Sequence, residues 1–267
     1  MTGTLLQVIT LIAYGNNYLQ NREMPASFDS VNTAFQFCNK VDFNEIENQK
    51  EKVIAATPTK WFECLKAEGC KHLRIYFEYP KDQSFAKPHM LAGFVGGGGT
   101  WLIEAIYDNY SNFWAARWEV TNRNAPDRKI WTVNYRLVAK KLQTRNQQID
   151  NQSIKNNLRQ TLTEISDFAL KNNQQYFGEV FIKAKNILDM TSPEENYYPK
   201  DLLPFGNYSP IAKQLLFSAN VAWVFGGMGS WNDLGFKDKE SNDTYARLSE
   251  QLYSNIIEAI IAGINTY

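Results

Sequence analysis

TWLIEAIYD (residues 100–108), FWAARWEVT (113–121) and KIWTVNYRLVAKK (129–141) decide the fold of this chain. Apolar and polar residues alternate in each stretch, which is the period of a β-strand with one buried face. The connections NYSN and NRNAPDR are rich in turn residues, so the three stretches predict an antiparallel meander. The register must then keep one wide aromatic face together, formed by Trp101, Ile103, Ala105, Tyr107, Trp114, Ala116, Trp118, Val120, Trp131, Val133, Tyr135 and Leu137.

The chain before the meander is also predicted to be mainly β. The apolar, β-branched run LLQVITLIAY (5–14) and the alternating stretch 31–43 indicate two strands. KHLRIYFEY (71–79) indicates a third strand, which Pro80 ends. A further strand is expected at 90–95, just before the meander.

Helical signals dominate the second half of the chain. Ser209-Pro210 combines a capping hydroxyl with proline at the first helical position. Thr57-Pro58, in the first half of the chain, does the same. Apolar residues then recur at helical spacing. The expected helices cover residues 57–68, 154–169, 177–188, 209–225 and 243–265.

These elements predict an α+β fold. We expect an antiparallel β-sheet from the N-terminal half, with one face covered by helices mainly from the C-terminal half. The chain is expected to form one domain over residues 1–267, β-rich over 1–142 and helical over 150–267. The polar linker 143–151 is where an internal boundary could fall.

Composition excludes several classes of protein. Of the 267 residues, 44% are hydrophobic and 14% aromatic, which is incompatible with a disordered chain. Lys plus Arg and Asp plus Glu both total 28, and this neutral balance argues against a nucleic-acid partner. The longest uncharged run, 214–232, contains three glycines that would interrupt a spanning helix, so no membrane segment is expected.

The three cysteines, Cys38, Cys64 and Cys70, cannot all pair within one chain, which favours a reducing compartment. With no convincing signal peptide at the N-terminus, a cytoplasmic location is expected. Cys64, Cys70, His72 and His89 do not follow a zinc spacing, so neither a metal nor another cofactor is expected. The same group is the only local candidate in the sequence for Cys/His nucleophilic catalysis.

The first candidate site is the stretch SANVAWVFGGMGSWNDLGF (218–236), which is free of charged residues up to Asn232. Trp231 offers a flat apolar surface, while Asn232 and Asp233 offer an amide and a carboxylate beside it. This combination suits a carbohydrate, an aromatic ligand or a partner protein. The alternative is a helix stop at Gly226 followed by a turn with one packed tryptophan.

The second candidate site is the polar face of the meander, which carries Glu104, Arg117, Glu119 and Arg136. A four-residue turn would place Glu104 opposite Arg117, so an ion pair is expected between them. Paired carboxylates such as Glu104 and Glu119 could also support acid–base chemistry. The alternative is a solvated face with exposed ion pairs of about 1 kcal/mol or less.

The third candidate is the glycine run Gly96–Gly99, which could cradle a phosphate or another anion. Phosphate loops normally lead into a helix, whereas this run leads into a predicted strand, so a plain turn is the alternative.

The hypothesis that best fits these features is a binding or protein-interaction module, with a protein as partner. It would use the aromatic glycine-rich loop and the polar sheet face. Two alternatives stay open: a carboxylate-dependent hydrolase, which could also use Asp233, and a nucleotide or anion binder.

Overall fold

The computed structural model describes residues 2–47, 49–82, 84, 86–94, 96–144, 148–196 and 200–266. The chain divides into two compact units. The sheet unit comprises Met1–Tyr76, Trp101–Gln147 and Tyr198–Pro204, and the helical unit comprises Phe77–Thr100, Gln148–Tyr197 and Phe205–Tyr267. The passage from 147 to 148 falls inside the polar linker 143–151.

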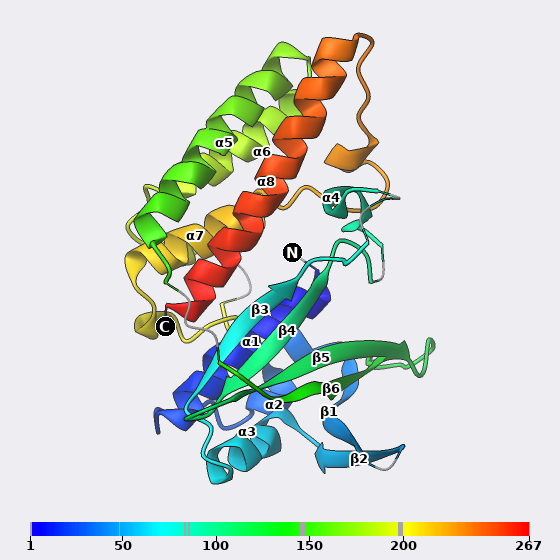
Figure 1. The fold of residues 1–267 in the computed structure, drawn as a ribbon, viewed down its shortest axis with the longest axis vertical. Helices are drawn as coiled ribbons and strands as arrows, with labels where there is room; N and C mark the ends of the chain where they lie inside the picture. Colours follow the sequence, from blue (N-terminus) through cyan, green and yellow to red (C-terminus); the bar gives the residue numbers. More distant parts are fainter. Residues whose placement is uncertain are drawn as a thin grey trace. The chain divides into compact units, whose positions relative to one another are not determined.

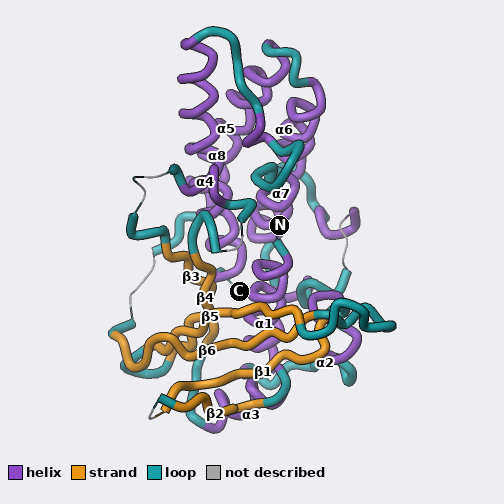
Figure 2. The backbone as a smooth tube through the Cα atoms, turned by 90° about the vertical axis from the view of Figure 1, so that its right-hand side faces the viewer, coloured by secondary structure: helices purple, strands orange, loops and turns teal. Residues whose placement is uncertain are grey.

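A six-stranded sheet dominates the sheet unit, with strand order β2-β1-β6-β5-β4-β3 (Figure 2). The expected α+β class is confirmed, but the sheet is mixed rather than purely antiparallel, because β1 pairs with β6 in parallel. A parallel pair joins segments far apart in the chain, so no local turn signals it. The strands are β1 (Cys38–Glu47), β2 (Lys50–Ala55), β3 (His72–Glu78), β4 (Thr100–Ile106), β5 (Ser111–Val120) and β6 (Trp131–Leu142).

The run 5–14 is helical, and the prediction of a strand there is wrong. It forms most of α1 (Gly3–Leu19), which Thr2 caps by accepting a hydrogen bond from the Leu5 N–H. Nearly every residue from Leu5 to Asn17 is buried, polar ones included. A helix buried all round has no apolar stripe, so its sequence resembles that of a buried strand.

Within the sheet unit, helices of the N-terminal half cover the aromatic face of the sheet. On α1, Gln7 accepts a hydrogen bond from the Tyr135 hydroxyl at 2.9 Å. On α3 (Pro58–Ala67), Trp61 stacks on Phe43 with ring centroids 4.2 Å apart. The sequence predicted that C-terminal helices cover this face. The structure corrects this, because α1 and α3 of the N-terminal half lie on it.

The C-terminal segment of the sheet unit closes against its N-terminal part. The Asp201 carboxylate accepts a hydrogen bond from the Thr33 N–H at 2.6 Å, and its carbonyl accepts one from Asn32 at 2.7 Å. The Leu202 carbonyl accepts one from the Thr10 hydroxyl at 3.3 Å. Residues 200–204 thus belong to this unit although helices of the other unit precede them in the chain.

The helical unit contains four long helices packed side by side (Figure 1). The serine cap of α7 is confirmed, since the Ser209 hydroxyl accepts a hydrogen bond from the Ala212 N–H. Within the described residues, every helix is too short or too polar to serve as a membrane span. The helices are α4 (Pro88–Leu91), α5 (Asn151–Lys171), α6 (Gln175–Ile187), α7 (Pro210–Val221) and α8 (Lys239–Asn265).

Two further strand predictions are corrected. Residues 31–43 begin with the end of α2 (Phe28–Val31) and the 3-10 turn η1 (Thr33–Phe35), and strand β1 starts only at Cys38. Residues 90–95 were expected to be a strand, but Met90 belongs to the short helix α4, which begins at Pro88. Val95 lies outside the described residues.

Candidate functional site

One face of the sheet carries a connected group of charged and amide side chains, which we call the polar sheet face. The strand register aligns Asp42, Asn134 and Arg117 in one row across β1, β6 and β5. Neighbouring rows place Lys40 near Glu119, and Asn44 beside Arg136. The polar sheet face consists of Lys40, Asp42, Asn44, Glu51, Arg117, Glu119, Asn134 and Arg136.

Each carboxylate of this face has a cationic partner. Lys40 pairs with Asp42, Arg117 with Glu119 at 2.8 Å, and Arg136 with Glu51 at 3.0 Å. A hydrogen bond from Asn44 and the nearby Arg136 guanidinium hold the pKa of the Glu51 carboxyl below its usual value. The face is therefore neutral overall, with three positive and three negative side chains in alternation.

Two amide oxygens stand out beneath these charges. Asn44 is 4% exposed, and its side-chain amide interacts with the Glu51 carboxylate and helps to lower the pKa of that acid. The Asn134 nitrogen donates to Asp42 at 2.7 Å. Because carboxylates only accept, both amide orientations are fixed, with nitrogen toward the acid. The opposite atoms, Asn44 Oδ1 and Asn134 Oδ1, are buried and have no hydrogen-bond partner among the described residues.

Glu104 lies on the same side of the sheet but belongs to a separate pair. The register places it opposite Phe113, whereas Arg117 lies opposite Asn134. The expected Glu104–Arg117 ion pair is therefore wrong, because the turn pairs Ile106 with Ser111 and fixes every later partner. Instead, the Arg74 guanidinium donates to both carboxylate oxygens of Glu104 at 3.1 Å each.

Trp231 points inward. Its side chain is 0% exposed, and its ring packs edge-on against Phe177 and Phe181 with centroids 5.2 and 5.1 Å away. The indole N–H donates to the Ser249 hydroxyl at 2.7 Å. The sequence left two hypotheses for Trp231, a binding surface and a packed turn. The structure shows the packed turn, and the ring presents no surface to a ligand.

The neighbours of Trp231 hold the loop together. Ser230 and Asp233 form a capping box around the short 3-10 turn η4 (Trp231–Asp233). The Asp233 carboxylate accepts from the Gly229 N–H at 2.6 Å and from the Ser230 N–H at 3.2 Å. Asn232 donates to the His89 carbonyl at 2.9 Å. These polar groups, predicted as binding residues, thus have structural partners within the helical unit.

The segment that follows α4 contacts the glycine-rich loop that contains Gly226, Gly227 and Gly229. A Cβ on Gly93 would collide with the Gly226 carbonyl, so the two backbones touch. Around this contact, the His89 ring packs against Phe225 with centroids 5.9 Å apart, and Asn232 holds the His89 carbonyl. We call this group, His89, Gly93, Phe225, Gly226 and Asn232, the glycine junction.

The contact at Gly93 predicts a sharp difference between two glycines of the helical unit. Gly93→Ala should lower the free energy of unfolding by about 1–3 kcal/mol, because the methyl group meets backbone that cannot move aside cheaply. Gly227→Ala is the matched control: nothing lies within 4 Å of its added Cβ, so it should change stability by no more than about 1 kcal/mol. Guanidinium unfolding followed by circular dichroism measures both. Equal effects would contradict the contact.

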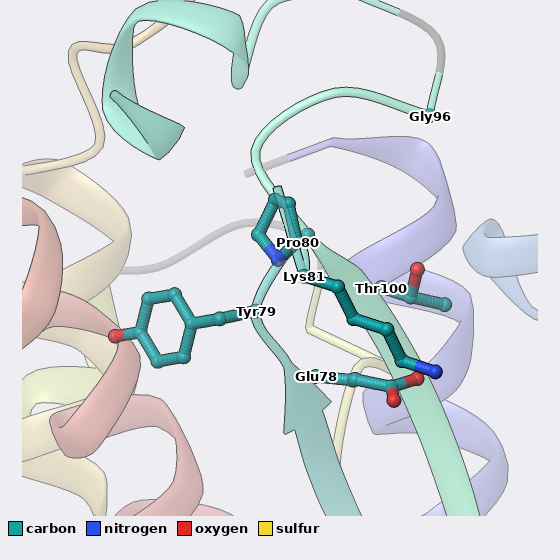
Figure 3. Close-up of a pocket in the computed structure, with 7 residues that line it drawn as sticks. Glu78, Tyr79, Pro80, Lys81, Gly96 and Thr100 are labelled. Atoms are coloured by element: carbon teal, nitrogen blue, oxygen red, sulfur yellow. The ribbon is translucent and has the colours of Figure 1, made fainter. Parts of the chain in front are cut away.

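A small cavity of about 260 Å³ lies beside the run Gly96–Gly99 in the helical unit. Figure 3 shows the Lys81 and Glu78 side chains extending to the side on which Thr100 lies, while Tyr79 extends to the opposite side. The cation and the carboxylate balance each other, and the run continues into strand β4 rather than a helix. The cavity therefore lacks the helix N-terminus that phosphate loops use.

The structure shows no metal site in the part of the chain that it describes. There, no group of three or more His, Cys, Asp or Glu side chains is arranged to hold a metal ion. Burial raises the pKa of the Cys70 thiol to about 12, so this cysteine stays protonated at neutral pH and is a poor nucleophile.

The sequence located Arg117, Glu119 and Arg136 on one face but missed their partners on β1 and β2. Asp42 and Asn44 alternate with buried Val41 and Phe43, a strand signal that begins only at Cys38. Alternation alone could have grouped Lys40, Asp42 and Asn44. Their pairing with β6 could not be read from it, because that register is long-range.

Comparison of the chain with protein-family models, with curated proteins and with solved structures finds no match.

Proposed function

We propose that this chain is a binding protein whose polar sheet face recognises a partner protein. The observation that carries the proposal is the pair of buried amide oxygens, Asn44 Oδ1 and Asn134 Oδ1, which have no partner within the described residues. Buried polar atoms are nearly always hydrogen-bonded in native proteins, and each exception calls for an explanation. A partner that supplies the missing donors is such an explanation.

The chemistry of the face limits what the partner presents there. The three carboxylates already have cationic partners, so a further net charge would be uncompensated. The vacant positions are acceptors only, which calls for neutral donors such as a main-chain N–H, a side-chain amide or a hydroxyl. A polypeptide segment provides several such donors at regular spacing.

The long charged side chains beside the two amides, such as Arg117, are suited to an interface with a partner protein. The Arg117 side chain is 54% exposed and its pair with Glu119 is equally open to solvent, so little free energy holds it in place. It can rotate away and admit a partner segment to the buried oxygens. Arginine is also a frequent anchor in protein interfaces.

The hydrolase alternative finds no support in the positions of its proposed acids. Glu119 lies six residues along β5 from Phe113, the partner of Glu104, which separates the two carboxylates by roughly 20 Å at about 3.4 Å per residue. Two-carboxylate catalysis uses separations below about 10 Å. Glu104 is also held by Arg74, and Asp233 by its own loop.

Site-specific photocrosslinking tests the proposal. A photoreactive amino acid is placed at Arg117 on the polar sheet face or, as the control, at Lys60, an exposed cation on α3 of the same unit. After irradiation in the source cell, position 117 should yield a discrete protein adduct and position 60 should not. The binding constant of the purified partner is then measured by calorimetry.

Asn44→Leu provides the decisive variant, since leucine has a similar size and offers no acceptor. Binding should weaken by roughly three- to tenfold, the effect of one lost neutral hydrogen bond. Circular dichroism shows whether the variant remains folded. No adduct at position 117, equal adducts at both positions, or unchanged affinity in the folded Asn44→Leu variant would each overturn the proposal.

A further inference from the structure

His89 lies at the centre of the glycine junction and is 5% exposed. Its ring packs between Phe225 and Tyr253, with centroids 5.9 and 6.5 Å away. Its Nδ1 atom is buried and, within the described residues, has no hydrogen-bond partner. The same holds for Oδ1 of the adjacent Asn232. The junction thus contains a titratable ring whose Nδ1 atom has no hydrogen-bond partner in the described part of the chain.

Among the described residues, a hydrogen bond and a backbone contact join the loop 226–233 to α4 and the segment after it. The Asn232 amide donates to the His89 carbonyl, and Gly226 lies against Gly93. The loop itself carries glycines at positions 226, 227 and 229, which can adopt backbone conformations that other residues rarely adopt, while the buried Trp231 anchors its far end. A change in the charge state of His89 therefore acts at the contact between this loop and α4.

We propose that the glycine junction is an acid-sensitive latch: it is closed while His89 is neutral, and protonation of His89 releases the loop 226–233 from α4. The imidazolium carries an N–H donor on each ring nitrogen, and in the closed junction no described residue places an acceptor within hydrogen-bond distance of Nδ1. Opening brings the ring into water. The latch works within the helical unit and does not depend on the polar sheet face.

The charged groups around His89 do not cancel this effect. Lys87, just before α4, forms an ion pair with Glu250 of α8 at 3.2 Å. Tyr253, also on α8, donates its hydroxyl to the Gly98 carbonyl at 3.0 Å. In the loop, the Asp233 carboxylate is held by its own capping box. Glu250 favours the charged ring and Lys87 opposes it, but burial is the largest influence and lowers the pKa of His89.

The direction of the pH dependence follows from this lowered pKa. The open junction binds a proton near the usual histidine pKa of about 6.5, and the closed junction binds it only at lower pH. Above about pH 6.5 both states are neutral and the latch keeps its full stability. As the pH falls below that value, the open state takes up the proton first, so the loop opens progressively.

The chain has two histidines, which makes a clean test possible. Burial also lowers the pKa of His72, which lies in the sheet unit, so His72→Gln is the matched control for His89→Gln. Hydrogen exchange is measured between pH 7.5 and 5.0 on peptides covering 86–94 and 222–234, relative to the α5 peptide 151–171. Intrinsic exchange rates are corrected for pH.

The opening equilibrium of the two junction peptides should rise on acidification in the unmodified protein and in His72→Gln. The rise should be about tenfold for each pK unit by which the closed junction lowers the pKa of His89. It should be absent in His89→Gln. Titration of the His89 ring by NMR gives a second readout that needs no variant. A rise that persists in His89→Gln, no rise in the unmodified protein, or a His89 pKa at or above 6.5 would each refute the latch.

Discussion

Replacing Trp231 by alanine is expected to lower the free energy of unfolding by about 3–5 kcal/mol, the usual range for removing a fully buried tryptophan. The ring is 0% exposed and packs against Phe177, Phe181 and Tyr245. The substitution also deprives Ser249 of its donor. Guanidinium unfolding followed by circular dichroism measures the loss.

Met228 in the same loop supplies the control. Its side chain is fully exposed, so Met228→Ala should change stability by no more than about 0.5 kcal/mol. A loss below about 1 kcal/mol for Trp231→Ala would contradict the buried position of the ring. The packing also changes how a binding assay must be read: lost binding in Trp231→Ala would report unfolding rather than a missing contact.

The second large effect concerns Glu104. Glu104→Leu leaves the Arg74 guanidinium, whose side chain is 14% exposed, facing an apolar group in place of its carboxylate. Breaking a buried ion pair by removing one partner typically costs about 3–5 kcal/mol. Urea unfolding should show a loss in this range. Arg74→Met combined with Glu104→Leu should recover much of it, because no buried charge is then left.

Glu119→Leu is the matched control, since Glu119 also pairs with an arginine on the same side of the sheet. Its pair with Arg117 is about half exposed, so the loss should be at most about 1 kcal/mol and should shrink further in high salt. Equal losses at positions 104 and 119 would show that burial does not separate the two pairs.

Local chemistry explains which elements the sequence could predict. The cap at Thr57, which accepts from the Lys60 N–H, and the stop at Gly69 identify α3 without any tertiary information. The alternation in 100–141 likewise identifies β4, β5 and β6. These signals reside in the residues of each element. They hold wherever the element packs.

Burial explains the largest error. The polar residues Gln7, Thr10 and Asn16 of α1 are fully buried because each finds a partner inside the sheet unit. Asn16, for example, hydrogen-bonds both the N–H and the carbonyl of Leu73 in strand β3. Such residues look like the polar side of a strand or helix in the sequence, and only the tertiary contacts show otherwise.

The candidate site was predicted to the extent that it lies within the meander. Arg117, Glu119 and Arg136 share a face by simple alternation, whereas Asn44 and Glu51 join them only through the parallel β1–β6 pair and the β1–β2 hairpin. The aromatic loop was singled out because it lacks charge. Its tryptophan is fully buried, and the polar sheet face is the candidate site that the structure favours instead.

The segment 200–204 has a consequence for how the protein is made. The sheet unit begins at the N-terminus but needs Asp201 and Leu202 to complete its hydrogen bonds to Thr10, Asn32 and Thr33. A growing chain cannot finish this unit until α5 and α6 have left the ribosome, although domains usually fold in order of synthesis. Expression of residues 1–147 alone would therefore yield a sheet unit whose N-terminal region lacks the hydrogen bonds that Asp201 and Leu202 make.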